Sequence, residues 1–299
     1  MKVGLVLPMF SGDAGRVLAF ARRAEERGFD GVFAFDHLFP PGASPDRPSL
    51  EAYATLTAVA AGTSRIAVGT LVTRATLRRA GMLAKLAAAV DDVSGGRMIL
   101  GIGTGDPIDE LEHRVFDIEY LEKMERREHL VETVRAIKAL YGGVRWDGGS
   151  YVPAMTGPLL PPPVRPDGPP IWIGGFADAV VRLAAAEADA WNGWGMGVEE
   201  FSRKVRLLRE AAGQRPVSAT WGGIVVVGRD DDEVGRLLDR RRARGLEPAV
   251  WSGTTESLRA HLDALAAAGS TWSVLVLGGP PNRLDVIADE VLVEPRSSA

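Results

Sequence analysis

Asp36 and His37 directly follow a short apolar run, residues 31–35. If that run is a parallel strand of a barrel, its end lies on the face where barrel enzymes build their active sites. A histidine there can accept or donate a proton near neutral pH, and a neighbouring carboxylate can orient it. The pair could also simply begin a polar loop or cap a helix. We interpret Asp36 and His37 as candidate catalytic residues.

Glycines alternate in the second candidate segment, residues 101–105, which ends at the carboxylate of Asp106. Glycine weakens a strand unless something must approach its backbone closely. The pattern Gly-x-Gly-x-Gly arises often by chance and is poor evidence for a dinucleotide site. We therefore predict a face without side chains at Gly103, Thr104 and Gly105, where a flat ring could lie, with Asp106 at its edge.

A third segment, Gly174-Gly175-Phe176, lies between an apolar run and a predicted helix. Glycines before a helix leave backbone N–H groups free to hold a phosphate, aided by the helix dipole. A plain tight turn is the alternative. The segment 69–73, taken alone, indicates no chemistry.

Short apolar runs alternate along the chain with longer amphipathic ones, which is typical of parallel strands joined by helices. The predicted strands are 3–7, 31–35, 66–71, 98–103, 171–174, 190–194, 217–227 and 272–277, and the main helices are 14–27, 51–61, 82–93, 121–141, 177–186, 201–212, 231–244 and 284–289. We predict one α/β domain over residues 1–299, a (β/α)₈ TIM barrel. An insertion after strand four, approximately 107–170, is expected to cover the barrel mouth. A doubly wound open sheet is the alternative.

The composition excludes several classes of protein. The formal net charge is −4 with acids and bases interleaved, so we expect no nucleic-acid partner. The absence of cysteine excludes disulfides and thiolate metal ligands. His113, His129 and His261 lie on charged stretches; we expect them to be solvated and predict no metal site. No apolar run is long enough to span a membrane, and the first residues indicate a buried strand, so we expect a cytoplasmic protein.

Four blocks of the sequence resemble the luciferase-like monooxygenase superfamily, and most closely its branch that depends on the deazaflavin coenzyme F420. They are GVFAFDH at 31–37, AVAAGTSRIAVGT at 58–70, SGGRMILGIGTG at 94–105 and PIWIGG at 170–175, and they keep the family's order and spacing. A later segment, SGTTE at 252–256, looks like the one before the family's penultimate helix.

The resemblance implies roles for individual residues. Asp36 and His37 match the pair beside the edge and reactive face of the bound ring. Thr70, Leu71 and Val72 match a bulge behind the ring, and we place a non-prolyl cis peptide at Leu71–Val72.

Two further positions match the family's pattern. Asp106 falls where some members carry a catalytic glutamate, and its shorter side chain reaches less far. Gly174, Gly175 and Phe176 match the phosphate-binding turn.

Aromatic residues add to the candidate site. Trp191, Trp194, Trp221 and Trp251 fall near strand ends, and we expect at least two of them, Trp191 included, to line the pocket or the cofactor groove; packing in the core is the alternative. The first predicted strand ends in Pro8-Met9-Phe10, so the substrate pocket is expected to be apolar on that side.

These observations predict an oxidoreductase that transfers a hydride between coenzyme F420 and a small organic substrate. An FMN-dependent monooxygenase on the same barrel is the nearest alternative. A non-catalytic flavin-binding barrel is a further one, although it would need neither the Asp36–His37 pair nor Asp106. A cofactor-free barrel aldolase or isomerase is a third, without a strand-ending lysine for a Schiff base. We expect a homodimer.

Overall fold

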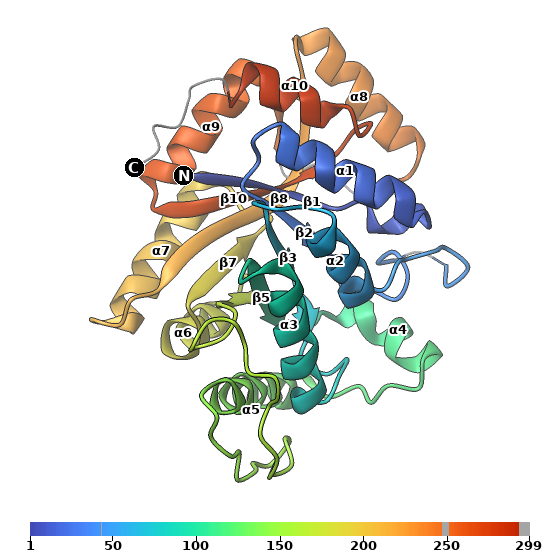
Figure 1. Ribbon diagram of the computed structural model, residues 1–299. Helices are drawn as coiled ribbons and strands as arrows, with labels where there is room; N and C mark the ends of the chain where they lie inside the picture. The colour runs from blue at the N-terminus through green and yellow to red at the C-terminus, as the bar shows by residue number, and fades with distance from the viewer. Residues whose placement is uncertain (43, 247–250, 293–299) are drawn as a thin grey trace.

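Eight parallel strands close into a barrel in the computed structural model, which describes residues 1–42, 44–246 and 251–292 (Figure 1). The sheet runs in the order β1, β2, β3, β5, β6, β7, β8, and β10 closes it by pairing with both β8 and β1. The barrel strands are β1 (Lys2–Val6), β2 (Gly31–Ala34), β3 (Ala67–Thr70), β5 (Met98–Gly103), β6 (Ile171–Gly174), β7 (Ala190–Trp194), β8 (Ser218–Gly228) and β10 (Ser270–Leu277). The predicted TIM barrel is confirmed.

Most of the helices around the barrel bury one apolar face. In α1, for example, Val17, Ala21 and Ala24 are buried, and Asp13 caps the first turn through the backbone N–H of Arg16. The helices are α1 (Ala14–Glu26), α2 (Ala52–Ala61), α3 (Ala80–Ser94), α4 (Glu110–Val115), α5 (Lys123–Tyr141), α6 (Asp178–Glu187), α7 (Val198–Ala212), α8 (Asp231–Ala243), α9 (Thr255–Ala267) and α10 (Arg283–Glu290), with 3-10 turns η1 (Met9–Ser11) and η2 (Pro107–Asp109).

Two short strands were not predicted. β4 (Thr73–Arg74) pairs with β5, and β9 (Trp251–Thr254) pairs with the end of the long strand β8. The segment resembling the one before the family's penultimate helix thus contains β9 and the start of α9.

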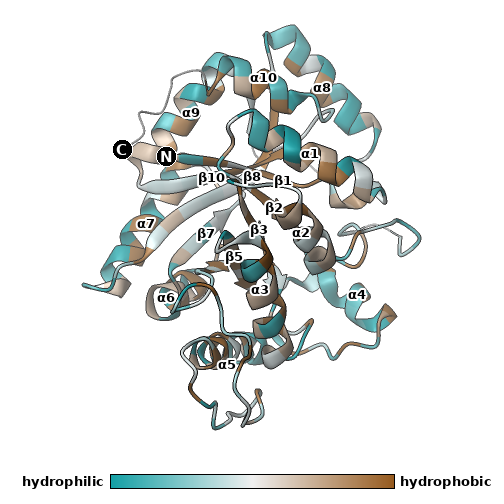
Figure 2. Ribbon diagram, in the orientation of Figure 1, coloured by the Kyte–Doolittle hydropathy of each residue, from teal (hydrophilic) through white to brown (hydrophobic). Residues whose placement is uncertain are grey.

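Apolar side chains fill two regions. Phe33, Trp172 and Trp272 pack against one another inside the barrel, and a larger cluster lies between the strands and the helices. Figure 2 accordingly shows hydrophobic colour along the central strands and hydrophilic colour on outer parts of the helices. Among the residues that the structure describes, no helix is both long and apolar enough to cross a membrane.

The segment 107–170, predicted to cover the barrel mouth, divides into two parts. The part with η2 and α4 reaches the active-site residues. The rest follows the outer side of α3 and α5, where Glu132 accepts hydrogen bonds from the backbone of residues 150–152 and Lys85 donates to the carbonyl of Leu160. From the second part, Arg126 at the start of α5 also reaches the mouth, where it donates to the carbonyl of Gly105.

A bulge after β3 explains the alternating glycines of β5. The peptide Leu71–Val72 is cis, as the family resemblance implied. A Cβ atom at Gly101 would lie 2.1 Å from the carbonyl oxygen of Thr70, and one at Gly103 would lie 2.9 Å from Cγ2 of Val72. The close approach that Gly101 and Gly103 permit is therefore that of the protein's own bulge, and the ring expected beside Gly103, Thr104 and Gly105 stays a prediction.

Candidate active site

An apolar floor closes the top of the barrel where the strands end. Phe35, Val72 and Trp194 lie above the inner core, and the rings of Phe35 and Trp194 meet edge to face at 5.7 Å between centroids. Beside this floor, between the ends of β1 and β10, is a cavity of about 210 Å³. Its lining residues are Val6, Leu7, Pro8, Met9, Phe10, Ser11, Phe20, Phe35, Val276, Leu277, Gly279 and Pro281. The apolar pocket predicted at the end of strand one is therefore present.

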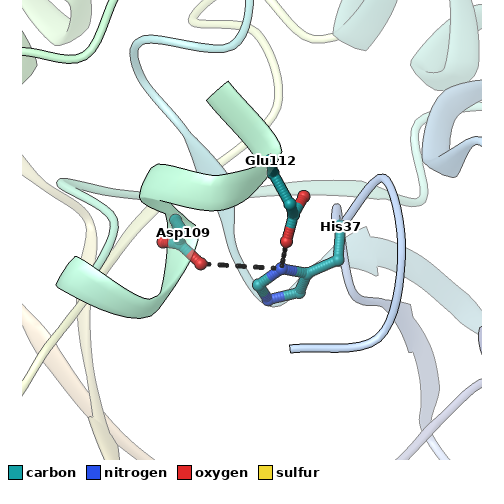
Figure 3. Close-up of side chains that lie close together, drawn as sticks. All are labelled: His37, Asp109 and Glu112. Atoms are coloured by element: carbon teal, nitrogen blue, oxygen red, sulfur yellow. Dashed lines mark hydrogen bonds and ion pairs between the residues drawn. The ribbon is translucent and has the colours of Figure 1, made fainter. Parts of the chain in front are cut away.

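His37 lies at the edge of this floor. Its ring centroid is 6.2 Å from that of Phe35 and 6.4 Å from that of Phe10, both of which line the cavity. Its side chain is 20% exposed. Nδ1 lies 2.7 Å from Oε1 of Glu112, and Figure 3 shows the other ring nitrogen pointing away from Glu112. His37 is thus held through one nitrogen and offers the other to a ligand.

Glu112, on α4, is buried and bonded through both carboxylate oxygens. Its Oε2 accepts from the backbone N–H of Leu38 at 2.7 Å and from the guanidinium of Arg74 at 2.8 Å. Burial opposes its ionisation. Hydrogen bonds from His37 and Leu38 and the charge of Arg74 outweigh that effect and hold the pKa of Glu112 below its ordinary value.

Asp109 and Arg74 complete this buried cluster. Nη1 of Arg74 lies 3.3 Å from Oδ1 of Asp109, and Oδ2 of Asp109 accepts from the backbone N–H of Asp106. His37, Asp109 and Glu112 could together offer three ligand atoms to a cation. Arg74, however, already pairs with both carboxylates, and its positive charge disfavours a metal ion there.

Asp36 lies below the floor, separate from His37's cluster. It is 2% exposed, and its carboxylate binds the guanidinium of Arg78 at 2.5 and 3.1 Å and the hydroxyl of Thr73. Arg78 also pairs with Glu51 and stacks on the ring of Tyr53. In this arrangement Asp36 orients the segment after β3 and does not contact the imidazole of His37.

Asp106 lies at the exposed rim of the mouth. Desolvation and the neighbouring carboxylate of Asp109 raise its pKa, against the opposing charges of Arg126 and His37. Arg126 donates to the carbonyl of Gly105. A Cβ atom at Gly105, where φ is +74°, would lie 3.0 Å from Arg74, so glycine is required here for the arginine to approach.

The turn after β6, residues 174–176, exposes its backbone at the start of α6. Gly175 has φ +147°, and Ala177 caps α6 without a side-chain hydrogen bond. Phe176 is 60% exposed. Below the turn, the ammonium of the buried Lys204 binds the carbonyl of Phe176 and lies 2.5 Å from Asp178. The lysine offsets the negative charge of Asp178 in the first turn of α6.

The tryptophans occupy different environments. Trp191 is fully buried, stacks on Phe201 and donates its indole N–H to the carbonyl of Gly175, so it supports the turn from behind. Trp221 is also fully buried, and Trp251 stacks on His261. Of the four, Trp194 belongs to the floor of the mouth, and Trp191 contacts the Gly174–Phe176 turn; that at least two of them line the pocket or the cofactor groove stays a prediction.

The three histidines expected to be solvated are not. His113 is 2% exposed and bonds the carbonyl of Glu119, while His129 and His261 are half-buried. Burial lowers the pKa of all three.

Sequence reasoning missed Thr73, Arg74, Arg78, Asp109 and Glu112. A signal existed just beyond the segment 69–73, which taken alone indicates no chemistry. Arg74 and Arg78 lie four residues apart after the carboxyl end of a barrel strand. Asp109 and Glu112 are three residues apart, which places them on one side of a helix.

Comparisons with known proteins identify relatives. The chain is 30% identical over 230 residues to an F420-dependent glucose-6-phosphate dehydrogenase from Microbacterium testaceum, a match covering 75% of this chain and 62% of that protein. It is also 30% identical over 239 residues to the enzyme of the same name from Kineococcus radiotolerans, covering 79% and 66%. The match spans less than two thirds of either relative's length.

Solved structures share the fold. An F420-dependent secondary alcohol dehydrogenase in complex with an F420–acetone adduct superposes with a TM-score of 0.84 at 18% identity, over 97% of this chain and 98% of that one. The coenzyme F420-dependent tetrahydromethanopterin reductase of Methanopyrus kandleri superposes with a TM-score of 0.80 at 18% identity, over 97% and 98%. A monooxygenase from Streptomyces bottropensis reaches 0.77 at 22% identity, over 98% and 99%.

The sequence profile of the luciferase-like monooxygenase family matches residues 1–274, nearly the whole barrel. With the strand-three bulge, the glycines of β5 and the turn after β6 all in place, this chain belongs to the luciferase-like monooxygenase family.

Proposed function

We propose that the protein is an oxidoreductase that transfers a hydride between coenzyme F420 and a small, mostly apolar alcohol or carbonyl compound. The observation that carries the proposal is the position of His37, whose outward nitrogen lies at the edge of an apolar floor and cavity. The F420-dependent relatives support the choice of cofactor.

The residues present fit a deazaflavin with a phosphate-bearing side chain. The uncapped start of α6 and the Gly174–Phe176 turn would hold the phosphate, because the first backbone N–H groups of a helix lack intrahelical partners. Lys204 offsets the carboxylate of Asp178, which would otherwise repel an anion. The bulge at Thr70–Val72 would lie behind the ring, and Thr104 and Gly105 at its edge.

When bound, the cofactor would supply a ring carbon that takes up or releases a hydride. The protein's own part is to place the substrate and to handle the accompanying proton. His37 would exchange that proton with the substrate oxygen. Asp106, with its raised pKa, would be an auxiliary proton donor at the rim.

The lining of the cavity favours an apolar substrate over a sugar phosphate. Its residues include Ser11 but no lysine, arginine or histidine. A substrate phosphate buried there would lack a charged partner, which is costly in a poorly solvated site. We therefore expect short secondary alcohols or ketones to be better substrates than glucose 6-phosphate, as relative kcat/KM values measured with F420 would reveal.

Titration of the purified apoprotein tests the cofactor. We expect F420 to bind with a micromolar Kd and FMN to bind at least tenfold more weakly, as followed by fluorescence. Tighter binding of FMN would overturn the proposal and favour an FMN-dependent monooxygenase; one of the proteins of similar fold is named as a monooxygenase. Binding of either cofactor without any turnover would favour a non-catalytic flavin-binding barrel.

We also infer a cytoplasmic homodimer. The absence of cysteine is compatible with a reducing compartment. Ile108, Val115 and Phe116 expose apolar side chains on the segment after β5, which supports a contact between copies. Light scattering coupled to size-exclusion chromatography would give the mass, and a monomer of 31.9 kDa would contradict the dimer.

A further inference from the structure

The contacts of His37 assign different roles to its two ring nitrogens. Nδ1 faces Oε1 of Glu112 at 2.7 Å and Oδ1 of Asp109 at 3.7 Å. An ionised carboxylate has no hydrogen to donate, so Nδ1 must carry the hydrogen of this bond. In the neutral ring Nε2 is then unprotonated, and Figure 3 shows it on the side of the ring away from Glu112.

We propose that Glu112 is a positioning residue that fixes the Nδ1–H tautomer of His37 and thereby presents Nε2 to the substrate as a proton acceptor, while Arg74 fixes Glu112. The role of Nε2 toward a substrate rests on the proposed function, whereas the assignment of the Nδ1–H tautomer does not.

Glu112 is suited to this task because hydrogen bonds hold its carboxylate group in one orientation. The backbone N–H of Leu38 and the guanidinium of Arg74 both donate to Oε2, which leaves Oε1 for the imidazole. Arg74 itself is 3% exposed and held between Glu112 and Asp109. The orientation of the imidazole therefore follows from a buried network rather than from solvent.

The contact with Glu112 occupies Nδ1, so Nε2 is the nitrogen through which His37 can exchange a proton with a substrate. In the oxidation of an alcohol, the hydroxyl oxygen would give its proton to Nε2 as the carbon gives up its hydride, leaving a carbonyl group; reduction reverses both transfers.

Replacement of Glu112 by glutamine gives a distinctive test. Leu38 and Arg74 would hold the amide oxygen where Oε2 lies now, which places the amide NH₂ against Nδ1. Nδ1 must then accept, and the hydrogen moves to Nε2, the same effect that an amide has in place of the carboxylate of a catalytic triad. We expect the neutral tautomer of His37 to reverse in Glu112→Gln.

The measurement is a long-range ¹H–¹⁵N correlation spectrum of the apoprotein labelled with ¹⁵N-histidine, at a pH where His37 is neutral. The signals of His37 are identified by their absence in His37→Ala. We expect Nδ1–H in the unmodified protein and Nε2–H in Glu112→Gln. With F420 and an active substrate, the variant should also lose at least 100-fold in kcat with an unchanged cofactor Kd.

Glu132→Gln is the matched control. Glu132 likewise accepts backbone hydrogen bonds, from residues 150–152, and they hold its pKa below the ordinary value against the opposing effect of desolvation. It does not contact His37, whose tautomer should stay Nδ1–H in this variant. An Nε2–H tautomer in the unmodified protein would overturn the inference, as would the same tautomer with and without Glu112. Failure to bind F420 would refute the proposed function and leave this result standing.

Discussion

His37 gains its role from a residue far along the chain. The carboxylate next to it in sequence, Asp36, is committed to Arg78 and Thr73. Its actual partner, Glu112, lies 75 residues later. Adjacent residues of an extended segment point in opposite directions, so the Asp36–His37 pair divides into one residue that stabilises the segment after β3 and one that faces the mouth.

Removal of the His37 imidazole should abolish most turnover. We expect His37→Ala to lower kcat by 10²–10⁴-fold, the usual contribution of a general acid or base, with the Kd of F420 changed little. His129→Ala, at a half-buried histidine on α5, is the control and should keep activity. Steady-state rates and fluorescence titration measure the two effects, and equal rates in the two variants would contradict the assignment.

Asp36 should matter chiefly for stability. Asp36→Asn removes the charge that faces Arg78 in a buried site, and breaking such a pair costs roughly 3–5 kcal/mol. Its control, Asp285→Asn, breaks ion pairs of a side chain that is 35% exposed and should cost about 0–1 kcal/mol. Urea unfolding measures both, and similar losses in the two variants would argue against a structural role for the Asp36–Arg78 pair.

At the scale of elements, the bulge after β3 and the glycines of β5 form one unit. The carbonyl of Thr70 lies where a side chain of residue 101 would be, and the hydroxyl of Thr70 donates to the carbonyl of Gly101 at 2.7 Å. Val72 covers Gly103 and Gly174 in the same way. The floor of the mouth therefore depends on three strands packing without side chains between them.

A methyl group at residue 101 should disrupt this unit. Because the Cβ atom would meet a backbone oxygen at 2.1 Å, we expect Gly101→Ala to lower the free energy of unfolding by about 3 kcal/mol or more. Gly235→Ala is the matched control in α8, where a Cβ meets nothing within 4 Å and the change should stabilise by about 0.5–1 kcal/mol. If the two variants changed the free energy of unfolding equally in chemical denaturation, the expected clash of residue 101 with the carbonyl of Thr70 would be contradicted.

At the scale of the whole molecule, buried or bonded carboxylates tie the outer elements together. Glu25 on α1 accepts from the backbone of residues 64–66, and Glu132 holds the segment after α5. Glu233 joins α8 to α10 through Arg283 and accepts from the backbone of Arg229. Each of these contacts is stronger with the ionised carboxylate, and the pKa of each glutamate is lowered, so the fold should be sensitive to acid.

The hydrogen bond from Arg283, with that from the backbone of Arg229, lowers the pKa of Glu233 to about 2 from an ordinary 4.5. The folded state then binds fewer protons than the unfolded state between these values, so stability is present above about pH 4.5 and is lost as the pH falls toward 2. Glu233→Gln should flatten this part of the profile, whereas Glu256→Gln at an exposed position should not. Unfolding free energies measured from pH 6 to 2.5 test this, and parallel profiles for both variants would contradict it.

The sequence by itself determined the barrel and most of what surrounds it. Alternating apolar runs and amphipathic helices are local patterns, and a chain in which every unit repeats strand and helix has few other ways to bury both. The glycine-rich strand ends and the cis peptide at Leu71–Val72 followed from a family resemblance carried by contiguous residues. These features depend on neighbours in sequence, so the sequence was sufficient for them.

Only the tertiary structure decided which side chains meet at the mouth. Glu112, Asp109 and Arg74 reach His37 from two other segments, and their contact depends on how η2 and α4 fold back over the strand ends. The same applies to Trp191, which is the second residue of β7 and whose ring turns outward to the helices. Strand periodicity dictates that the side chains of neighbouring residues point to opposite faces of the sheet. Which of these faces points into the barrel depends on how closure of the barrel sets the register of its strands.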